Sequence, residues 1–256
     1  MRNNSILEQF IDRKAIGQKS IAVLIDPDKI TNREGLLHLI GIANENYVDY
    51  FFIGGSLLTS DTMSEVIQLI KSNSKIPVVL FPGSNLQIDT NADAILLLSL
   101  ISGRNPDLLI GQHVVAAPIL KKSGLEIIST GYLLVDGSNK TTVAYMSNTT
   151  PIPADKPSVA ACTAIAGEML GMKIIYMDAG SGAETPINSK MIRSVQKSVE
   201  CPLVVGGGIN SVDKAKVALE AGADIIVIGN AIEKDPNLLI EVSAKIYDIN
   251  KALNIH

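Results

Sequence analysis

The sequence predicts an α/β protein that folds as a single (β/α)8 barrel, the TIM barrel, modified by the loss of its third outer helix. Eight short apolar runs rich in β-branched residues recur along the chain, each closed by Gly, Asp, Pro or Ser. Amphipathic segments of helix length separate most of these runs. The length of 256 residues suits one barrel, so we expect a single domain over residues 1–256.

The runs are continuously apolar, which is typical of parallel strands covered by helices on both faces of a sheet. The expected strands are Ile21–Ile25, Tyr50–Ile53, Val78–Phe81, Ala94–Leu100, Glu126–Val135, Lys173–Met177, Leu203–Val205 and Asp224–Ile228. The expected helices are Arg33–Glu45, Ser60–Ser72, Asp107–Lys122, Ser158–Leu170, Ser189–Ser198, Ser211–Ala221 and Asn237–Leu253. Eight strands with intervening helices favour a closed barrel over an open sheet.

The connection between the third and fourth strands is too short for a packed helix. Only the twelve residues from Pro82 to Asp93 intervene, and they include Pro, Gly, Ser, Asn and Asp. We therefore expect the third helix to be missing or replaced by an extended segment, with a single-turn helix as the alternative. A missing helix would open the wall of the barrel to a long apolar ligand.

The longest polar stretch, Asp136–Lys156, follows the fifth strand and contains Pro151 and Pro153. A loop of this length predicts either a lid over a site or a disordered segment.

Composition excludes several classes of function. The formal charge of −4 and the lack of a Lys/Arg block argue against nucleic acid as the main partner. The apolar runs fall far short of the ~20 residues of a membrane span, and the N-terminus does not resemble a signal peptide. We therefore expect a soluble cytoplasmic protein, in which Cys162 and Cys201 are buried, reduced thiols.

Two glycine-rich turns predict a phosphate site at the carboxyl ends of the strands. Gly206-Gly207-Gly208 follows the seventh strand, and Gly229-Asn230 follows the eighth. Glycine lets backbone N–H groups approach an anion closely, and barrels commonly bind phosphate after these two strands. Neither turn contains Lys or Arg, so backbone dipoles would do most of the binding; the alternative is that the glycines only form tight turns.

The turn after the sixth strand adds a carboxylate and a hydroxyl to this site. It reads Asp178-Ala179-Gly180-Ser181-Gly182. Asp178 could hydrogen-bond an alcohol of a small phosphorylated molecule or take its proton, or it could only cap the local turn.

Hard oxygen ligands are predicted on the opposite side of the mouth. Asp26 and Asp28 follow the first strand, and Ser56 follows the second. These groups suit Mg²⁺, which takes few protein oxygens and shares its other positions with phosphate and water. The alternative is a proline turn in which Asp28 caps a helix. The three histidines, His38, His113 and His256, have no metal-binding spacing and are expected to be packing or surface residues.

Five motifs together resemble the geranylgeranylglyceryl phosphate synthases and the related bacterial heptaprenylglyceryl phosphate synthases. The motifs are Asp26-Pro27-Asp28-Lys29, Ile53-Gly54-Gly55-Ser56, Tyr176–Ala183, Val205–Ile209 and Gly229–Ile232. The resemblance covers essentially the whole chain, in motif order. It implies a barrel without the third helix and an Mg²⁺-dependent prenyl transfer. In the implied reaction, the 3-hydroxyl of sn-glycerol 1-phosphate would attack C1 of a polyprenyl diphosphate, and diphosphate would leave.

The resemblance also implies the roles of individual residues. Asp26 and Ser56 would bind Mg²⁺, and Asp178 would be the candidate catalytic residue. The glycerol phosphate would be bound by Tyr176, Met177, Asp178, Ala179, Gly180, Ser181, Gly182, Gly207, Gly208, Gly229 and Asn230.

The chain departs from the family pattern at two positions. The family commonly has Glu at the position of Asp178, and many members have Lys at the position of Leu24. These departures resemble the subgroup that uses geranylgeranyl diphosphate. The resemblance and the high apolar content also predict a homo-oligomer, and we expect the protein to make transient membrane contact for its lipid product.

Two other functions remain open. A phosphate-binding barrel could be an isomerase or lyase acting on a sugar phosphate, although neither Lys29 nor Lys173 is well placed for a Schiff base. A non-catalytic protein could use the glycines to bind a phosphorylated effector.

Overall fold

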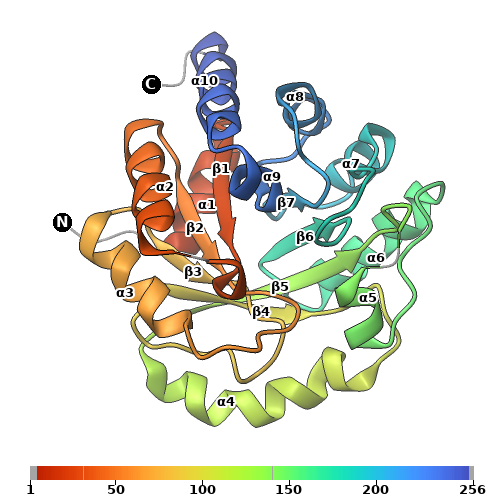
Figure 1. Ribbon diagram of the computed structural model, residues 1–256. Helices are drawn as coiled ribbons and strands as arrows, with labels where there is room; N and C mark the ends of the chain where they lie inside the picture. Colours follow the sequence, from red (N-terminus) through yellow and green to blue (C-terminus); the bar gives the residue numbers. More distant parts are fainter. Residues whose placement is uncertain (1–4, 31, 140, 254–256) are drawn as a thin grey trace.

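The computed structural model describes residues 5–30, 32–139 and 141–253, and it contains a closed barrel of eight parallel strands (Figure 1). Each strand pairs with the next, and β8 pairs with β1. The strands are β1 Ser20–Ile25, β2 Tyr50–Ile53, β3 Val78–Leu80, β4 Ala94–Ser99, β5 Glu126–Leu134, β6 Ile174–Asp178, β7 Leu203–Gly206 and β8 Ile225–Ile228. The predicted fold class is confirmed.

The predicted helices are all present within a few residues of their expected ends. They are α2 Arg33–Glu45, α3 Met63–Asn73, α4 Gln112–Ser123, α6 Pro157–Met169, α7 Ser189–Gln196, α8 Val212–Glu220 and α10 Asn237–Ala252. A π-helical turn, Asp107–Gly111, precedes α4, and a 3-10 turn, Pro27–Lys29, follows β1. Three short helices were not predicted: α1 Ile6–Ala15, α5 Thr142–Ser147 and α9 Asn230–Lys234.

The outer helix that would follow β3 is missing, as the sequence predicted; the helix labelled α3 lies between β2 and β3. Residues 81–93 contain no helix, and buried polar side chains hold this connection in place. Gln87 accepts a hydrogen bond from Gly83 N at 3.0 Å and donates one to Gly55 O at 2.9 Å. Asp89 accepts from Asn91 N at 2.8 Å and also from the Ser64 hydroxyl on α3. These contacts replace the packing that a helix would provide.

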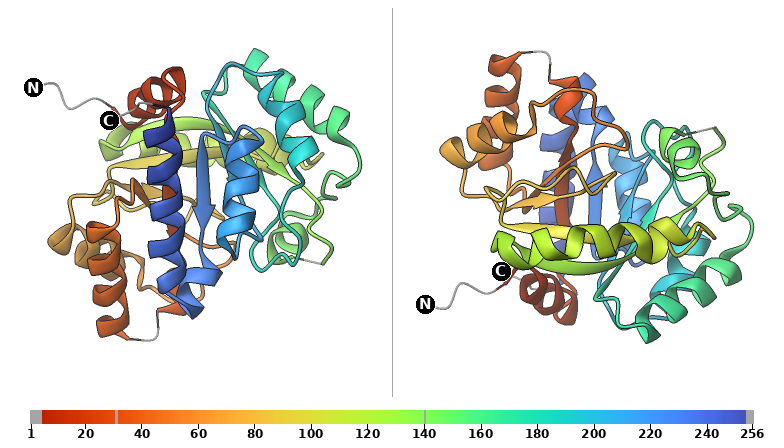
Figure 2. Two further views of the ribbon diagram at one scale, coloured as in Figure 1. Left: turned by 90° about the horizontal axis from the view of Figure 1, so that it is seen from above. Right: turned by 90° about the horizontal axis from the view of Figure 1, so that it is seen from below.

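Helix α1 closes the amino-terminal end of the barrel. Both views of Figure 2 place it at the end opposite α5. Ile6 and Phe10 join the apolar interior of the barrel, and the Phe10 ring meets Tyr50 edge-to-face at 4.9 Å. The Glu126 carboxylate at the start of β5 accepts hydrogen bonds from Ile6 N and Leu7 N at 2.6 and 2.8 Å. Because the first N–H groups of a helix have no partner within it, this carboxylate anchors α1 to the barrel.

Segment 136–156 forms part of the wall of the mouth. Apart from residue 140, it is described, and it contains α5 and a bridge between Val135 and Ile152. Val143, Met146 and Ser147 line the cavity at the carboxyl ends of the strands. The segment thus contributes side chains to the cavity wall.

The prediction that both cysteines are buried was wrong for Cys162. Both thiols are free, but Cys162 is exposed and Cys201 is half-buried. Helix α6 buries Ala160, Ala161 and Ala164, and the helical period turns position 162 toward solvent. Among the described residues, no helix is long and apolar enough to cross a membrane.

Candidate active site

A cavity of about 1140 Å³ opens at the carboxyl ends of the strands. Polar residues and glycines line its centre, whereas apolar residues line one side. The apolar side is lined by Met63 of α3, Ile88 of the connection after β3, Ile95 and Leu97 of β4, and Ala116 and Leu120 of α4. These residues lie where the third helix would pack, so the missing helix leaves an apolar branch of the cavity. We call this branch the apolar trench.

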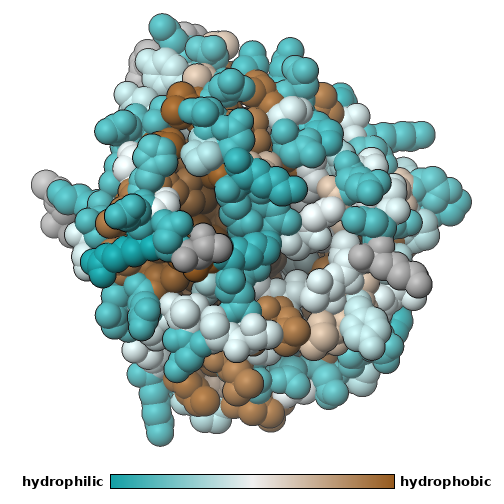
Figure 3. Space-filling view, in the orientation of Figure 1, coloured by the Kyte–Doolittle hydropathy of each residue, from teal (hydrophilic) through white to brown (hydrophobic). Residues whose placement is uncertain are grey.

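The opposite face of α4 is also apolar but faces solvent. On this face Val114, Val115 and Ile119 of α4 and Ile110 of the preceding π-helical turn are all exposed. Figure 3 shows apolar side chains gathered over α4 at the lower edge of the molecule. The helix therefore presents apolar surface both to the trench and to the exterior.

Three glycines of the predicted phosphate site have backbone conformations that other residues could adopt only with strain. Gly180, Gly207 and Gly208 have φ angles of 90°, 82° and 70°, in the left-handed region. A Cβ on Gly207 would lie 2.6 Å from Asp178 Oδ1 and 2.7 Å from Ala179 N. The turns after β6 and β7 thus pack backbone against backbone, and together with Gly182 and Gly229 they line the cavity.

Asp178 lies inside the barrel, where burial raises the pKa of its carboxyl. Its Oδ2 accepts a hydrogen bond from the Tyr132 phenol at 2.7 Å, and its Oδ1 accepts one from Gly180 N at 2.7 Å. Burial and the nearby Asp178 carboxylate raise the pKa of Tyr132 well above its ordinary value, so the phenol remains a donor. Asp178 therefore both holds its own turn, as the alternative interpretation required, and faces the cavity.

The segment Tyr176–Gly182 alternates between the cavity and the outer core. Tyr176, Asp178, Gly180, Ser181 and Gly182 line the cavity. The side chains of Met177 and Ala179 pack in the apolar layer outside the sheet instead. This alternation follows from the two-residue period of a strand, so any ligand contact at these two positions would have to come from the backbone.

Asp26 and Asp28, which are close in sequence, have different roles in the structure. Asp28 accepts hydrogen bonds from Thr59 N at 2.6 Å and Ser60 N at 3.1 Å and from both hydroxyls. These bonds lower the pKa of Asp28 to about 2. Asp28 therefore orders the loop after β2, close to the capping role of the alternative interpretation, and only Asp26 lines the cavity with Ser56.

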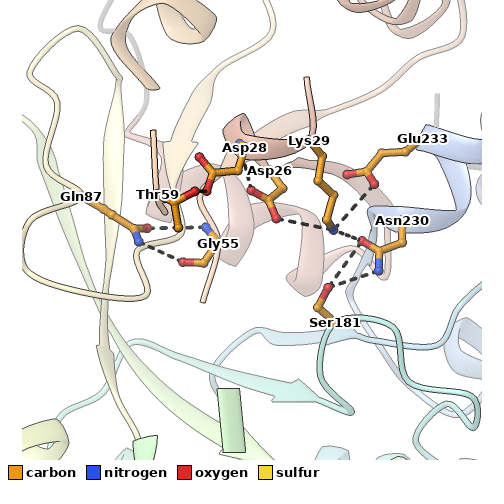
Figure 4. A network of polar contacts seen from close by, with 9 residues as sticks. All are labelled: Asp26, Asp28, Lys29, Gly55, Thr59, Gln87, Ser181, Asn230 and Glu233. Atoms are coloured by element: carbon orange, nitrogen blue, oxygen red, sulfur yellow. Dashed lines mark hydrogen bonds and ion pairs between the residues drawn. The ribbon is translucent and has the colours of Figure 1, made fainter. Parts of the chain in front are cut away.

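The structure brings a lysine into the mouth that sequence analysis did not assign to the phosphate site. Lys29 Nζ lies 2.5 Å from Asn230 Oδ1, 3.5 Å from Asp26 Oδ2 and 3.7 Å from Glu233 Oε2 (Figure 4). The Asn230 amide donates to Ser181 Oγ at 3.2 Å. The turn after β1 is thereby connected to the turns after β6 and β8.

The histidines are placed as expected where the structure describes them. His38 is exposed, and His256 lies outside the described residues. His113 lines the cavity, its Nε2 lies 3.0 Å from Ser99 Oγ, and burial lowers its pKa. Within the described part of the chain, no group of three or more His, Cys, Asp or Glu residues could hold a metal ion.

The chain is similar to a set of enzymes with one shared name. A geranylgeranylglyceryl phosphate synthase from Chitinophaga pinensis is 56% identical over 96% of this chain and 97% of that protein. A synthase of the same name from Pyrococcus horikoshii is 42% identical over 91% of each chain.

A solved structure gives the same picture. The crystal structure of (S)-3-O-geranylgeranylglyceryl phosphate synthase from Thermoplasma acidophilum, in complex with substrate sn-glycerol-1-phosphate, is 30% identical. It matches with a TM-score of 0.89, and the match covers 95% of this chain and 99% of the other. The model of the PcrB family matches residues 14–249. The chain therefore belongs to the PcrB family.

Proposed function

We propose that this chain is a prenyltransferase of the geranylgeranylglyceryl phosphate synthase type. It joins the 3-hydroxyl of sn-glycerol 1-phosphate to C1 of a polyprenyl diphosphate through an ether bond and releases diphosphate. One observation carries the proposal: a single cavity connects the glycine turns, Asp26 and the apolar trench. The relatives that bear this name, including one solved with glycerol phosphate bound, support it.

The glycine turns suit the glycerol phosphate. Gly207, Gly208 and Gly229 bring backbone close to the cavity, and Ser181 and Asn230 add side-chain donors. Asp178 lies beside Gly207, where it can accept a hydrogen bond from a hydroxyl of the bound alcohol. Holding the 3-hydroxyl next to the carbon it attacks is mainly a task of positioning.

Asp26 and Ser56 fit a magnesium ion. Asp26 is half-buried, and it lies against Gly55, where an added Cβ would be 3.0 Å from Oδ1. One carboxylate and one hydroxyl are hard oxygen donors, and Mg²⁺ is commonly bound by one or two carboxylates together with substrate phosphates and water. When bound, the ion would neutralise charge on the leaving diphosphate.

The apolar trench suits the prenyl tail. Burial of each CH₂-sized unit is worth roughly 0.8 kcal/mol, so a twenty-carbon tail provides ample binding energy. We favour geranylgeranyl diphosphate as the donor. The exposed apolar face of α4 supports our expectation that the protein forms a homo-oligomer and makes transient contact with membranes. We retain the cytoplasm as its expected location.

The test is a reconstitution with purified protein. We expect pyrophosphate release and an ether product only when sn-glycerol 1-phosphate, geranylgeranyl diphosphate and Mg²⁺ are all present. Mass spectrometry of products from mixed C15, C20 and C35 diphosphates identifies the preferred donor. Absence of ether product under these conditions would reject the proposal. Trapping of a sugar phosphate on a lysine with borohydride would instead support a lyase.

A further inference from the structure

Lys29 lies between the turn after β1, which contains Asp26, and the turns after β6 and β8. Its ammonium has one close partner, Asn230 Oδ1 at 2.5 Å, and two more distant carboxylates, those of Asp26 and Glu233, at 3.5 and 3.7 Å (Figure 4). Asn230 in turn contacts Ser181 in the turn after β6. A single cation thus stands between the carboxylate proposed for the metal and the turns proposed for glycerol phosphate.

The geometry leaves Lys29 able to bind a further acceptor. An ammonium has three N–H donors, and of these three neighbours only Asn230 is a close hydrogen-bond partner, since the carboxylates lie at 3.5 and 3.7 Å. The two carboxylates provide charge at longer range. Lys29 can therefore donate to an incoming oxygen while Asn230 continues to hold it.

The charges around Lys29 show why an anionic ligand would need this ammonium. Asp26 and Glu233 place two carboxylates around one ammonium, so a diphosphate entering beside them needs a positive partner from the chain. Lys29 and Lys234 are the lysines among the described residues that line the cavity, and Lys29 is the one that reaches Asp26. The glycine turns offer backbone donors to the other phosphate, and Lys29 contacts them only through Asn230.

We propose that Lys29 is a substrate-binding residue whose ammonium donates to a phosphoryl oxygen of the prenyl diphosphate, with Asn230 as its positioning partner. This inference rests on the proposed function. Besides the proposed Mg²⁺, it identifies a positive group for the diphosphate that the chain itself provides. Glu233 competes for the same ammonium before the ligand arrives. The ammonium also remains available to the diphosphate that the reaction releases.

The experiment measures binding of inorganic pyrophosphate and, separately, of sn-glycerol 1-phosphate by calorimetry, each with and without Mg²⁺. In Lys29→Met we expect pyrophosphate affinity to fall about tenfold or more, because a hydrogen bond to a charged group is worth at least that factor. Glycerol phosphate affinity should change much less. Lys29→Arg should restore part of the pyrophosphate affinity, and Glu233→Gln should raise it.

Lys214→Met is the matched control. Lys214 donates to Asn210 Oδ1 at 2.8 Å, much as Lys29 donates to Asn230, but it does not line the cavity. Its replacement should leave both affinities unchanged.

Three results would overturn the inference. They are unchanged pyrophosphate affinity in Lys29→Met, an equal loss of glycerol phosphate affinity in that variant, or a loss in Glu233→Gln as large as that in Lys29→Met. Ether synthesis by the wild-type protein separates this failure from failure of the proposed function.

Discussion

The phenol of Tyr132 on β5 donates a 2.7 Å hydrogen bond to Asp178 Oδ2 at the end of β6, inside the barrel. The strands are adjacent, with Tyr132 paired to Tyr176 in the register. Asp178 is thus a buried carboxylate held on one oxygen by a side chain and on the other by Gly180 N. Its charge is unfavourable for folding, and under the proposed function it is useful for binding an alcohol.

We expect Asp178→Asn to stabilise the protein and to remove most of its activity. Burial raises the pKa of Asp178 above its ordinary value of 3.8, so the protonated form is favoured in the folded state. Its contribution to stability is complete below about pH 4 and is lost as pH rises through the folded pKa. The uncharged amide avoids this loss. Thermal unfolding at several pH values should show a higher Tm at neutral pH; a lower Tm there would contradict the argument.

Replacing Tyr132 by Phe should shift the pH dependence of activity. The phenol hydrogen bond lowers the pKa of Asp178, so its loss should raise that pKa further. If the ionised carboxylate binds the alcohol, the acidic limb of kcat/KM moves to higher pH. The measurement is a pH–rate profile of wild type and variant. An unmoved limb would show that Asp178 does not act in its ionised form.

Replacement by Asn should lower stability at Asp28 but lower activity at Asp26. Asp28 has a pKa of about 2, so its stabilising effect is present above pH 4 and is lost as pH falls through about 2. Asp28→Asn should lower Tm at neutral pH. Asp26→Asn should leave Tm nearly unchanged but reduce turnover by about a hundredfold or more, because the proposed metal ligand is lost. Near-normal turnover in Asp26→Asn would place the metal elsewhere.

Gly207→Ala should weaken glycerol phosphate binding as well as stability. A left-handed φ of 82° costs an L-residue about 1–2 kcal/mol, and the added Cβ also collides with Asp178 and Ala179. Gly171→Ala is the matched control, because φ there is 90° but no atom lies within 4 Å of the added Cβ. Both variants should lose stability in denaturant titrations, whereas only Gly207→Ala should lose affinity for glycerol phosphate. If Gly207→Ala and Gly171→Ala bound glycerol phosphate with equal affinity, Gly207 would not be part of the phosphate site.

Filling the trench should exclude long donors without disturbing the phosphate site. Ala116 lines the trench, and a Trp there would occupy space proposed for the prenyl tail. We expect Ala116→Trp to lose C20 product relative to C15 product, with unchanged binding of glycerol phosphate by calorimetry. Val115→Trp on the exposed side of the same helix serves as control, since Val115 is 61% exposed. An unaltered product distribution in Ala116→Trp would place the tail elsewhere.

The barrel was predictable because its strands are buried on both faces and therefore continuously apolar. The missing third helix was predictable because a twelve-residue polar connection cannot hold a packed helix. Helix α1 was missed, although its start carries a capping box in which Ser5 accepts from Glu8 N and Glu8 accepts from Ser5 N. That spacing was a usable signal. Helices α5 and α9 are too short for a periodic apolar pattern.

The candidate site was predictable where backbone chemistry decides it and unpredictable where a long side chain does. Glycine turns after β6, β7 and β8 indicate a phosphate site wherever the strands end. The position of the Lys29 ammonium depends on its contact with Asn230, 201 residues away in the chain, which no local pattern records. The separation of Asp26 from Asp28 likewise depends on the loop holding Thr59 and Ser60.

The position of helix α1 has a consequence for how reactants enter and leave the barrel. Phe10 and Tyr50 pack against each other among the apolar side chains inside the barrel at its amino-terminal end, whereas the cavity lies at the carboxyl end. Under the proposed function, the glycerol phosphate and the prenyl diphosphate therefore both enter at the carboxyl end, and the lipid product leaves there as well. An entrance shared by both reactants, with the apolar trench beside it, would allow the head group to be released while the tail is still sheltered from water.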